Sequence, residues 1–251
     1  MKKGTRKPDI CLLLNSRTLE ELKSELNRYG EYCQAIEWRA DQSAGLELYS
    51  EAELIQILKL VKTMCKKKTF IFSYSGEGEV GNKILRSAMN VADYVEIDVH
   101  NSELKTLLKE ARRKRTKTLL SYCEMEHILS KEEVAEALIR MEAYGADLLA
   151  VSGFADKEAD AYALLEGAFA YNQLKKHKPF VVVAMGEEGQ ASRICCGDFG
   201  STMTYACGSR VTAPGQFNAE DLNRYMEIYY KQEETDGKHH KNRKFNIQLP
   251  R

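Results

Sequence analysis

Two opposite charges stand inside an otherwise apolar segment, where Glu37 and Arg39 flank Trp38 and Asp41 follows closely. A buried charged side chain is costly unless it is paired. The segment therefore predicts either a structural Glu–Arg pair inside the fold or two side chains that serve a functional site. In the second case Glu37 could act as a base toward a bound molecule.

Cys123 lies four residues before His127 in a Cys-Glu-Met-Glu-His run. A thiol can act as a nucleophile beside an imidazole when a third group orients that imidazole. No orienting group is visible in the sequence. The favoured interpretation is a buried, inert cysteine.

Residues 75–81 read Ser-Gly-Glu-Gly-Glu-Val-Gly and contain two acids, Glu77 and Glu79. The run lacks the Gly-Lys-Ser/Thr ending of a phosphate loop, and its carboxylates would repel a phosphate. It is interpreted as a loop, either a mobile lid over a substrate or an ordinary flexible connection. Its three glycines predict more mobility than in the strands when no ligand is bound.

Arg193 and Gln216 form a second candidate group, near two glycine-containing runs, Met185-Gly186 and Ala213-Pro214-Gly215. Arginine presents a planar fork that suits a carboxylate. Backbone amides together with Gln216 could complete a rim that binds an anion.

The elements that must position these residues alternate along the chain. Short apolar runs predict strands at residues 10–14, 35–40, 69–74, 94–97, 118–122, 148–152, 180–184 and 203–207. Amphipathic stretches predict helices at residues 18–29 (with Thr18 as N-cap), 51–65, 102–114, 131–144 and 156–174.

Apolar strands separated by helices indicate a parallel sheet that is buried on both faces. Eight such units in one chain favour an α/β fold of the (β/α)8 TIM-barrel type, with eight parallel strands and surrounding helices. The alternative is an open doubly wound sheet, but no Gly-x-Gly-x-x-Gly run follows the first strand. In such a barrel the functional residues lie at the carboxyl ends of the strands. Glu37 and Arg39 are therefore expected to point into that mouth and to share a hydrogen bond or a ligand.

The 251 residues divide into a basic extension (1–7), one barrel domain (8–230) and a polar, basic tail (231–251). Lys plus Arg equal Asp plus Glu at 37 each, so the overall charge favours neither nucleic acid nor an anionic membrane as a partner. Seven scattered cysteines without a Cys-x-x-Cys pair indicate a reducing compartment and no zinc site. With no apolar leader or membrane-length run, a cytoplasmic location is expected.

A series of short motifs, taken in order, resembles type I 3-dehydroquinate dehydratase over roughly residues 8–230. The motifs are Ile36-Glu37-Trp38-Arg39-Ala40-Asp41, Gly145-Ala146-Asp147, Met185-Gly186, Ser192-Arg193, Phe199-Gly200-Ser201 and Ala213-Pro214-Gly215-Gln216. The resemblance implies a (β/α)8 barrel, often a homodimer, that converts 3-dehydroquinate to 3-dehydroshikimate in the shikimate or quinate pathway. It also implies a lysine Schiff base, a histidine general acid/base, and no metal or diffusible cofactor.

The two residues that carry that chemistry are missing. The family has its lysine in an Asp-Ile-Pro-Lys run, whereas here Asp147 is followed by two leucines and then Ala150. The histidine belongs in a Ser-Tyr-His run, and this chain has Cys123 after Ser-Tyr. Lys157, seven residues after Ala150, is a poor substitute. No catalytic residue of the family is therefore intact, which predicts a pseudoenzyme.

The residues that would hold the substrate are partly kept. The resemblance implies that Glu37 and Arg39 bind ring hydroxyls of the substrate and that Glu79 is the family's loop acid. It also implies that the substrate's carboxylate is bound by Arg193, Thr212 and Gln216. Ser75 replaces an arginine and Leu13 replaces a polar residue. The implied ligand is a small hydroxylated cyclic carboxylate.

Three hypotheses remain open. The first is a binding protein that has lost its activity. The second is a dehydratase that uses displaced groups such as His127 and a remote lysine. The third is another reaction that uses Glu37, Glu79 or Cys123 as a base or nucleophile.

Overall fold

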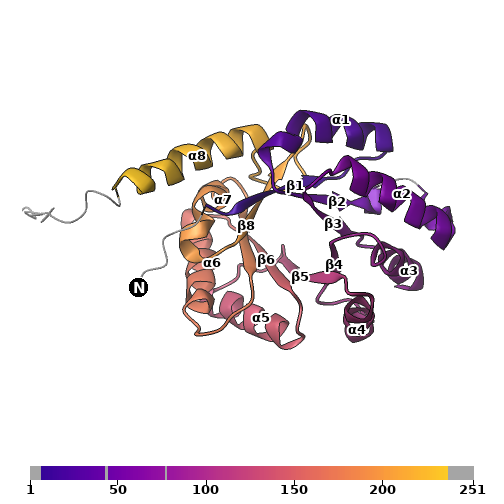
Figure 1. Ribbon diagram of the computed structural model, residues 1–251. Coiled ribbons are helices and arrows are strands. Elements are labelled where there is room, and N and C mark those ends of the chain that lie inside the picture. Colours follow the sequence, from indigo (N-terminus) through magenta and orange to yellow (C-terminus); the bar gives the residue numbers. More distant parts are fainter. Residues whose placement is uncertain (1–6, 43–44, 77, 237–251) are drawn as a thin grey trace, which may run out of the picture.

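Eight parallel strands form the centre of the computed structural model, which describes residues 7–42, 45–76 and 78–236 (Figure 1). The strands are β1 (Asp9–Leu14), β2 (Ala35–Arg39), β3 (Thr69–Ser73), β4 (Tyr94–Asp98), β5 (Lys117–Glu124), β6 (Leu148–Phe154), β7 (Phe180–Met185) and β8 (Met203–Cys207). They lie in the order β7-β6-β5-β4-β3-β2-β1-β8. The ends of this order, β7 and β8, are joined by a backbone hydrogen bond next to β8: the Thr202 N–H, one residue before β8, donates to the Phe180 carbonyl of β7 over 2.9 Å. The barrel is nearly closed, and the predicted (β/α)8 fold is confirmed.

Helices surround the strands (Figure 1). They are α1 (Leu19–Tyr29), α2 (Glu51–Met64), α3 (Gly78–Ala88), α4 (Leu104–Lys114), α5 (Lys131–Ala143), α6 (Glu158–Asn172), α7 (Gln190–Cys195) and α8 (Ala219–Asp236). Short 3-10 turns occupy Gly30–Tyr32, Ala40–Gln42, Leu46–Leu48 and Cys196–Phe199. Local capping starts several helices where the sequence predicts them: the Glu21 N–H donates to the Thr18 side chain over 3.1 Å, and Ser50 and Ser130 form capping boxes.

Alternate strand residues fill the barrel interior, because side chains in a strand point to opposite faces. The inward-facing set is mostly apolar and comprises Cys11, Ala35, Ile71, Leu119, Leu148, Ala150, Val181, Val183, Met185 and Met203. The opposite faces of the strands pack with the helices in a second, larger core. Toward the carboxyl ends of the strands, polar side chains also face inward. We call this end of the barrel the mouth.

The run at residues 75–81 is shorter as a loop than the sequence analysis predicts. Helix α3 begins at Gly78, so Glu79 lies on its exposed first turn, and Glu77 is outside the described residues. Two of the glycines have packing or conformational roles. Gly78 has a φ of +73°, and a Cβ on Gly81 would lie 1.8 Å from the Gly76 carbonyl oxygen. The glycines therefore allow a tight entry into a helix, and the predicted mobility remains a prediction.

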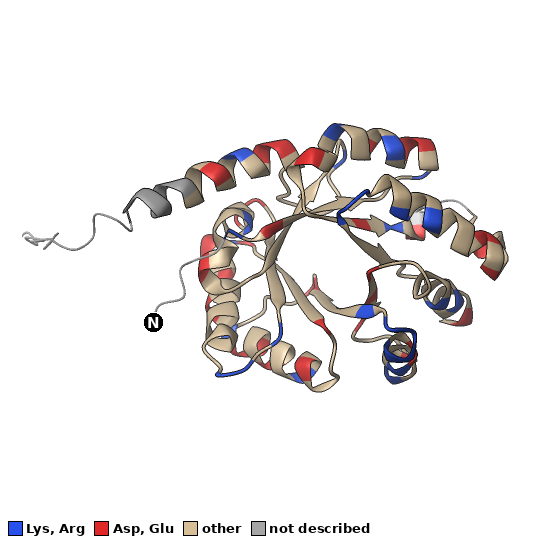
Figure 2. Ribbon diagram, in the orientation of Figure 1, with Lys and Arg blue, Asp and Glu red and all other residues tan. Residues whose placement is uncertain are grey.

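At the chain ends, α8 continues through residues 231–236, which the sequence analysis assigns to the polar tail. The remaining tail, residues 237–251, and residues 1–6 of the basic extension lie outside the described residues. On the helices, acidic and basic side chains are interspersed (Figure 2). In the described ranges, no helix is both long and apolar enough to cross a membrane.

Candidate functional site at the mouth of the barrel

Glu37 is buried on the inward face of β2, with 5% of its surface exposed. The Ser73 hydroxyl donates to its Oε1 over 2.8 Å, and the Tyr205 hydroxyl donates to its Oε2 over 3.0 Å. Burial raises the pKa of this carboxyl, while the bond from Ser73 and the charge of Arg39 oppose the rise. Strands β3 and β8 therefore fix a carboxyl that can accept further hydrogen bonds, or a proton, from the mouth.

Arg39, two residues on, also faces the mouth but does not hydrogen-bond to Glu37, contrary to one form of the prediction. Its guanidinium donates to the Ser75 hydroxyl over 3.3 Å and pairs with Asp41, with Nε and Oδ1 3.6 Å apart. Its interaction with Glu37 is through space. A shared ligand remains the other form of the prediction.

Glu96 is an inward carboxyl that the sequence analysis missed. It lies on β4 and accepts a hydrogen bond from Ser121 on β5. Burial is the largest cause that raises the pKa of Glu96 to about 7. The charge of Glu37 adds to the rise, whereas Ser121 and Arg39 oppose it. The available signal was a single acid between Val95 and Ile97 in a predicted buried strand.

We expect the free energy of unfolding of Glu96→Gln, relative to that of the unsubstituted protein, to increase as the pH rises from about 5 to 8. The native pKa is raised from 4.5 to about 7, so the native state binds more protons than the unfolded state in that interval and loses stability as Glu96 ionises. Each pKa unit is worth about 1.4 kcal/mol, which partial exposure reduces to a total of about 1–2 kcal/mol. Urea unfolding at several pH values measures the trend, with Glu132→Gln on the exposed first turn of α5 as control. A difference that does not vary with pH would contradict the assignment.

Ala150 and Cys123 occupy neighbouring strands. Ala150 is aligned with Ser121 on one side and Val181 on the other, and it is 5% exposed among the interior residues. Cys123, aligned with Ser152, is exposed, so the predicted burial of this cysteine is wrong. The reason is its place near the end of β5, where the strand reaches the solvent-filled rim. Desolvation nevertheless raises the pKa of the Cys123 thiol, which therefore stays protonated at neutral pH.

The residues that the sequence offers as substitutes, His127 and Lys157, are exposed and lie outside the strands. His127 is exposed and hydrogen-bonds to Glu133 of α5 over 3.1 Å. Within the eight strands, all of which the structure describes, the single lysine is Lys117 at the amino end of β5. Lys157 lies on the exposed start of α6. The part of the chain that the structure describes also contains no group of three or more His, Cys, Asp or Glu placed to hold a metal ion.

Arg193 of α7 is 2% exposed and has no carboxylate partner among the described residues. Its Nη2 donates to the Pro214 carbonyl over 3.1 Å, while its Nε has no hydrogen-bond partner there. Burial lowers the pKa of the guanidinium to about 10. A buried charge with so few partners is costly. The hydrogen bond to Pro214 places the Arg193 guanidinium against the β8–α8 loop.

That loop is held by Gln216. The Gln216 Oε1 accepts from the Thr212 N–H over 2.8 Å, the Thr212 hydroxyl over 2.7 Å and the Ala213 N–H over 3.0 Å. Because three donors fix the amide oxygen, the amide nitrogen is the end left to donate elsewhere. Gly215 has a φ of +73°, and a Cβ there would lie 2.0 Å from the Gly186 carbonyl oxygen. The loops after β7 and β8 are thus packed together around Arg193.

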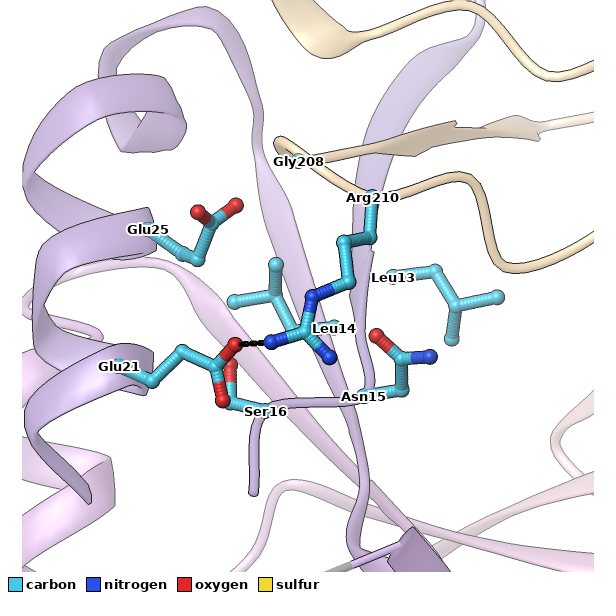
Figure 3. Close-up of a pocket in the computed structure, with 8 residues that line it drawn as sticks. All are labelled: Leu13, Leu14, Asn15, Ser16, Glu21, Glu25, Gly208 and Arg210. Carbon is cyan, nitrogen blue, oxygen red and sulfur yellow. Dashed lines mark hydrogen bonds and ion pairs between the residues drawn. The ribbon is translucent and has the colours of Figure 1, made fainter. Parts of the chain in front are cut away.

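Helix α1 holds the other side of the same loop, in the small pocket of Figure 3. Arg210 forms an ion pair with Glu21, and the Ser209 N–H donates to Glu25 over 2.7 Å. Leu13 lines this pocket beside Asn15. These contacts anchor the β8–α8 loop before it reaches Thr212.

The fold is a (β/α)8 barrel with polar groups gathered at the carboxyl ends of its strands, the place where enzymes of this fold have their active sites. The chain belongs to the type I 3-dehydroquinase family, whose model matches residues 10–233. A 3-dehydroquinate dehydratase of Bacillus licheniformis is 26% identical over 242 residues, covering 91% of this chain and 94% of the relative. The one from Clostridioides difficile is 24% identical, with 91% and 94% covered.

Solved structures agree with the fold. The type I 3-dehydroquinate dehydratase from Clostridium difficile, carrying covalently modified comenic acid, has a TM-score of 0.81 at 23% identity. The match covers 90% of this chain and 93% of that one. The 3-dehydroquinate dehydratase from Geobacillus kaustophilus has a TM-score of 0.81 at 19% identity, with 89% and 91% covered.

Proposed function

We propose that this protein binds 3-dehydroquinate, or a related hydroxylated cyclic carboxylate, in the mouth of its barrel without dehydrating it through a Schiff base. The observation that carries the proposal is that the eight strands, all of which the structure describes, hold no lysine toward their carboxyl ends. Ala150, at the position that the motifs assign to the lysine, offers a methyl group, and Lys117 lies at the opposite end of the barrel. A Schiff base requires an amine within bonding distance of the ketone.

Binding is supported by two groups of side chains with complementary roles. Arg193 would take the carboxylate of the ligand, aided by the Gln216 amide nitrogen and Thr212, because a charged donor pairs most strongly with an anion. Glu37 and Arg39 would take ring hydroxyls. Glu79, exposed on the first turn of α3, would reach the ligand only from the rim.

The alternative of displaced catalytic groups has less support. His127 is engaged by Glu133 away from the interior cluster, and loss of a positioned general acid/base costs about 10²–10⁴-fold in rate. Lys157 is exposed just before α6, outside the strands that line the barrel.

We expect purified protein to form no conjugated enone from 3-dehydroquinate, as followed by absorbance. Sodium borohydride should attach no substrate-sized mass to any lysine. The B. licheniformis relative, treated in parallel, serves as positive control for both assays. An adduct that maps to one lysine of the unsubstituted protein would overturn the proposal in favour of an active dehydratase.

A proton-transfer reaction on the bound acid is the second candidate function, and Glu96 is the observation that favours it. A carboxyl whose pKa is about 7 can exchange protons at neutral pH. Glu37, the base considered from sequence, is engaged by two hydroxyl donors, and Cys123 stays protonated. Deuterium exchange at carbons next to the ligand's ketone, measured by NMR with and without Glu96→Gln, tests this function.

A further inference from the structure

One side of the mouth carries an excess of acid. Five residues there interact electrostatically with one another, and we call them the acidic sector: Glu37, Arg39, Asp41, Glu96 and Asp98. They supply four carboxyl groups and one guanidinium. The guanidinium pairs directly with Asp41, at the rim. The two inner carboxyls, Glu37 and Glu96, are therefore stabilised mainly by neutral hydroxyl donors, from Ser73, Tyr205 and Ser121.

The remaining side of the mouth has the opposite imbalance. Arg193 is a nearly fully buried cation with an unbonded Nε and no carboxylate partner among the described residues. It cannot neutralise the acidic sector, because it is fixed to Pro214 in the β8–α8 loop, after the last strand. Among the described residues, the mouth thus holds a cation without a carboxylate partner on α7, and on β2 and β4 a set of carboxyl groups that outnumbers its one guanidinium.

We propose that the ligand of this mouth is an amino-substituted cyclic carboxylic acid, with its carboxylate at Arg193 and a protonated amine at Glu96 and Glu37. This inference rests on the proposed function and names its ligand class more narrowly. A ligand with both charges neutralises both sides at once, whereas a neutral hydroxyl leaves Arg39, which is paired with Asp41, as the one cation among the four carboxyl groups of the acidic sector. Charge-assisted hydrogen bonds are stronger than neutral ones, and the hydrogen bonds that Glu37 and Glu96 accept come from neutral hydroxyls, so an ammonium group gains most there.

The inner carboxyls also predict that a proton is released when such a ligand binds. Glu96 interacts with Glu37 and Arg39 on β2, with Asp98 on its own strand, with Ser121 and Cys123 on β5, and with Tyr205 on β8. An incoming ammonium favours the ionised form of a carboxyl. Its binding should therefore release a proton from Glu96 at slightly acid pH, where that carboxyl still carries one.

The test compares matched probes by isothermal titration calorimetry on the full chain. The probes are cis- and trans-4-aminocyclohexane-1-carboxylic acid, the corresponding hydroxy acids, and cyclohexylamine, which lacks the carboxylate. We expect an aminocyclohexane carboxylic acid to bind at least about tenfold more tightly than the corresponding hydroxy acid. At about pH 6 its binding enthalpy should vary with the ionisation enthalpy of the buffer, which reports proton release.

Variants separate the two ends of the ligand. Glu96→Gln should remove most of the preference for the amine and the proton release, while Glu132→Gln on the outer face of α5 should change neither. Arg193→Gln should weaken the amino and hydroxy acids alike. Thermal unfolding of each variant verifies that it is folded.

The outcomes distinguish this inference from the function on which it rests. If the hydroxy acids bind as tightly as the amino acids or more so, the amine inference is wrong and the proposed function stands. If none of these acids binds, and 3-dehydroquinate and quinate titrated in the same way do not bind either, both are wrong. If cyclohexylamine alone binds as well as the amino acids, the acidic sector is a general cation site and the two-ended ligand is wrong.

Discussion

A variant carrying both Ala150→Lys and Cys123→His should be trapped by borohydride on 3-dehydroquinate, whereas the unsubstituted protein should not. The introduced amine would stand on β6 among Ser121, Val181 and other interior side chains, where burial lowers a lysine pKa. The imidazole would stand at the end of β5, within the mouth. Mass spectrometry should therefore change from no adduct to an adduct on most molecules.

Turnover should recover far less than trapping. Ser75 and Leu13 stand where the family resemblance implies polar contacts, and Ser75 is already bonded to Arg39. A ligand misplaced by about 1 Å can lose about 10²-fold in rate. We expect enone formation at least about 100-fold below that of the B. licheniformis relative under the same assay.

The single variants provide the controls for this experiment. Cys123→His alone should give no adduct, because it adds no amine, whereas Ala150→Lys alone should give an adduct that forms slowly. If the folded double variant binds ligand and yet gives no adduct, then Ala150 is not the position of the family's lysine. Circular dichroism and thermal unfolding establish that it is folded.

The fold could be predicted from sequence because its signals are local. Each strand is an apolar run that must be buried on both faces, and each run recurs at the interval of a β/α unit. The ends were less accurate. Strand β5 extends from Lys117 to Glu124, beyond the predicted 118–122, because Cys123 and Glu124 continue the ladder without being apolar.

The site was predictable only where chain position alone determines it. Glu37 was found because it is a charge inside an apolar strand, and its burial follows from that place. Its partner Tyr205 lies 168 residues away, and no local pattern links the two. Glu96 was missed for the same reason, since its carboxyl acquires meaning only through Glu37 and Ser121 on neighbouring strands.

Composition predicted too long a loop at residues 75–81, because α3 already begins at Gly78. Three glycines suggested a flexible loop, yet Gly81 lies inside α3 and its missing side chain makes room for the Gly76 carbonyl. Glycine signals either freedom or close approach, and only tertiary contacts distinguish them.

Arg193→Met should reduce the affinity for a cyclic carboxylate by about 100-fold or more, while leaving the protein at least as stable as before. A buried, charge-assisted pair with an anion is among the strongest polar contacts, and its removal costs about 2–5 kcal/mol of binding free energy. Among the described residues the guanidinium has one hydrogen bond, to Pro214, and its Nε has no partner. Methionine fills similar space without that desolvation cost, so the free energy of unfolding should rise by about 1–3 kcal/mol.

The opposite signs of these two effects make the experiment decisive. A structural arginine would lose stability on substitution, and its ligand affinity would fall only as far as the fold is damaged. If the arginine serves to bind a ligand's carboxylate, its replacement lowers the affinity for the ligand and raises the stability of the free protein, because its charge is neutralised only when the ligand is present. Calorimetric titration with quinate and urea unfolding measure the two quantities on the same preparation. Arg224→Met, on the exposed face of α8, controls for removal of one positive charge and should shift neither by more than about 1 kcal/mol. Unchanged affinity in Arg193→Met would mean that the carboxylate is held elsewhere in the mouth.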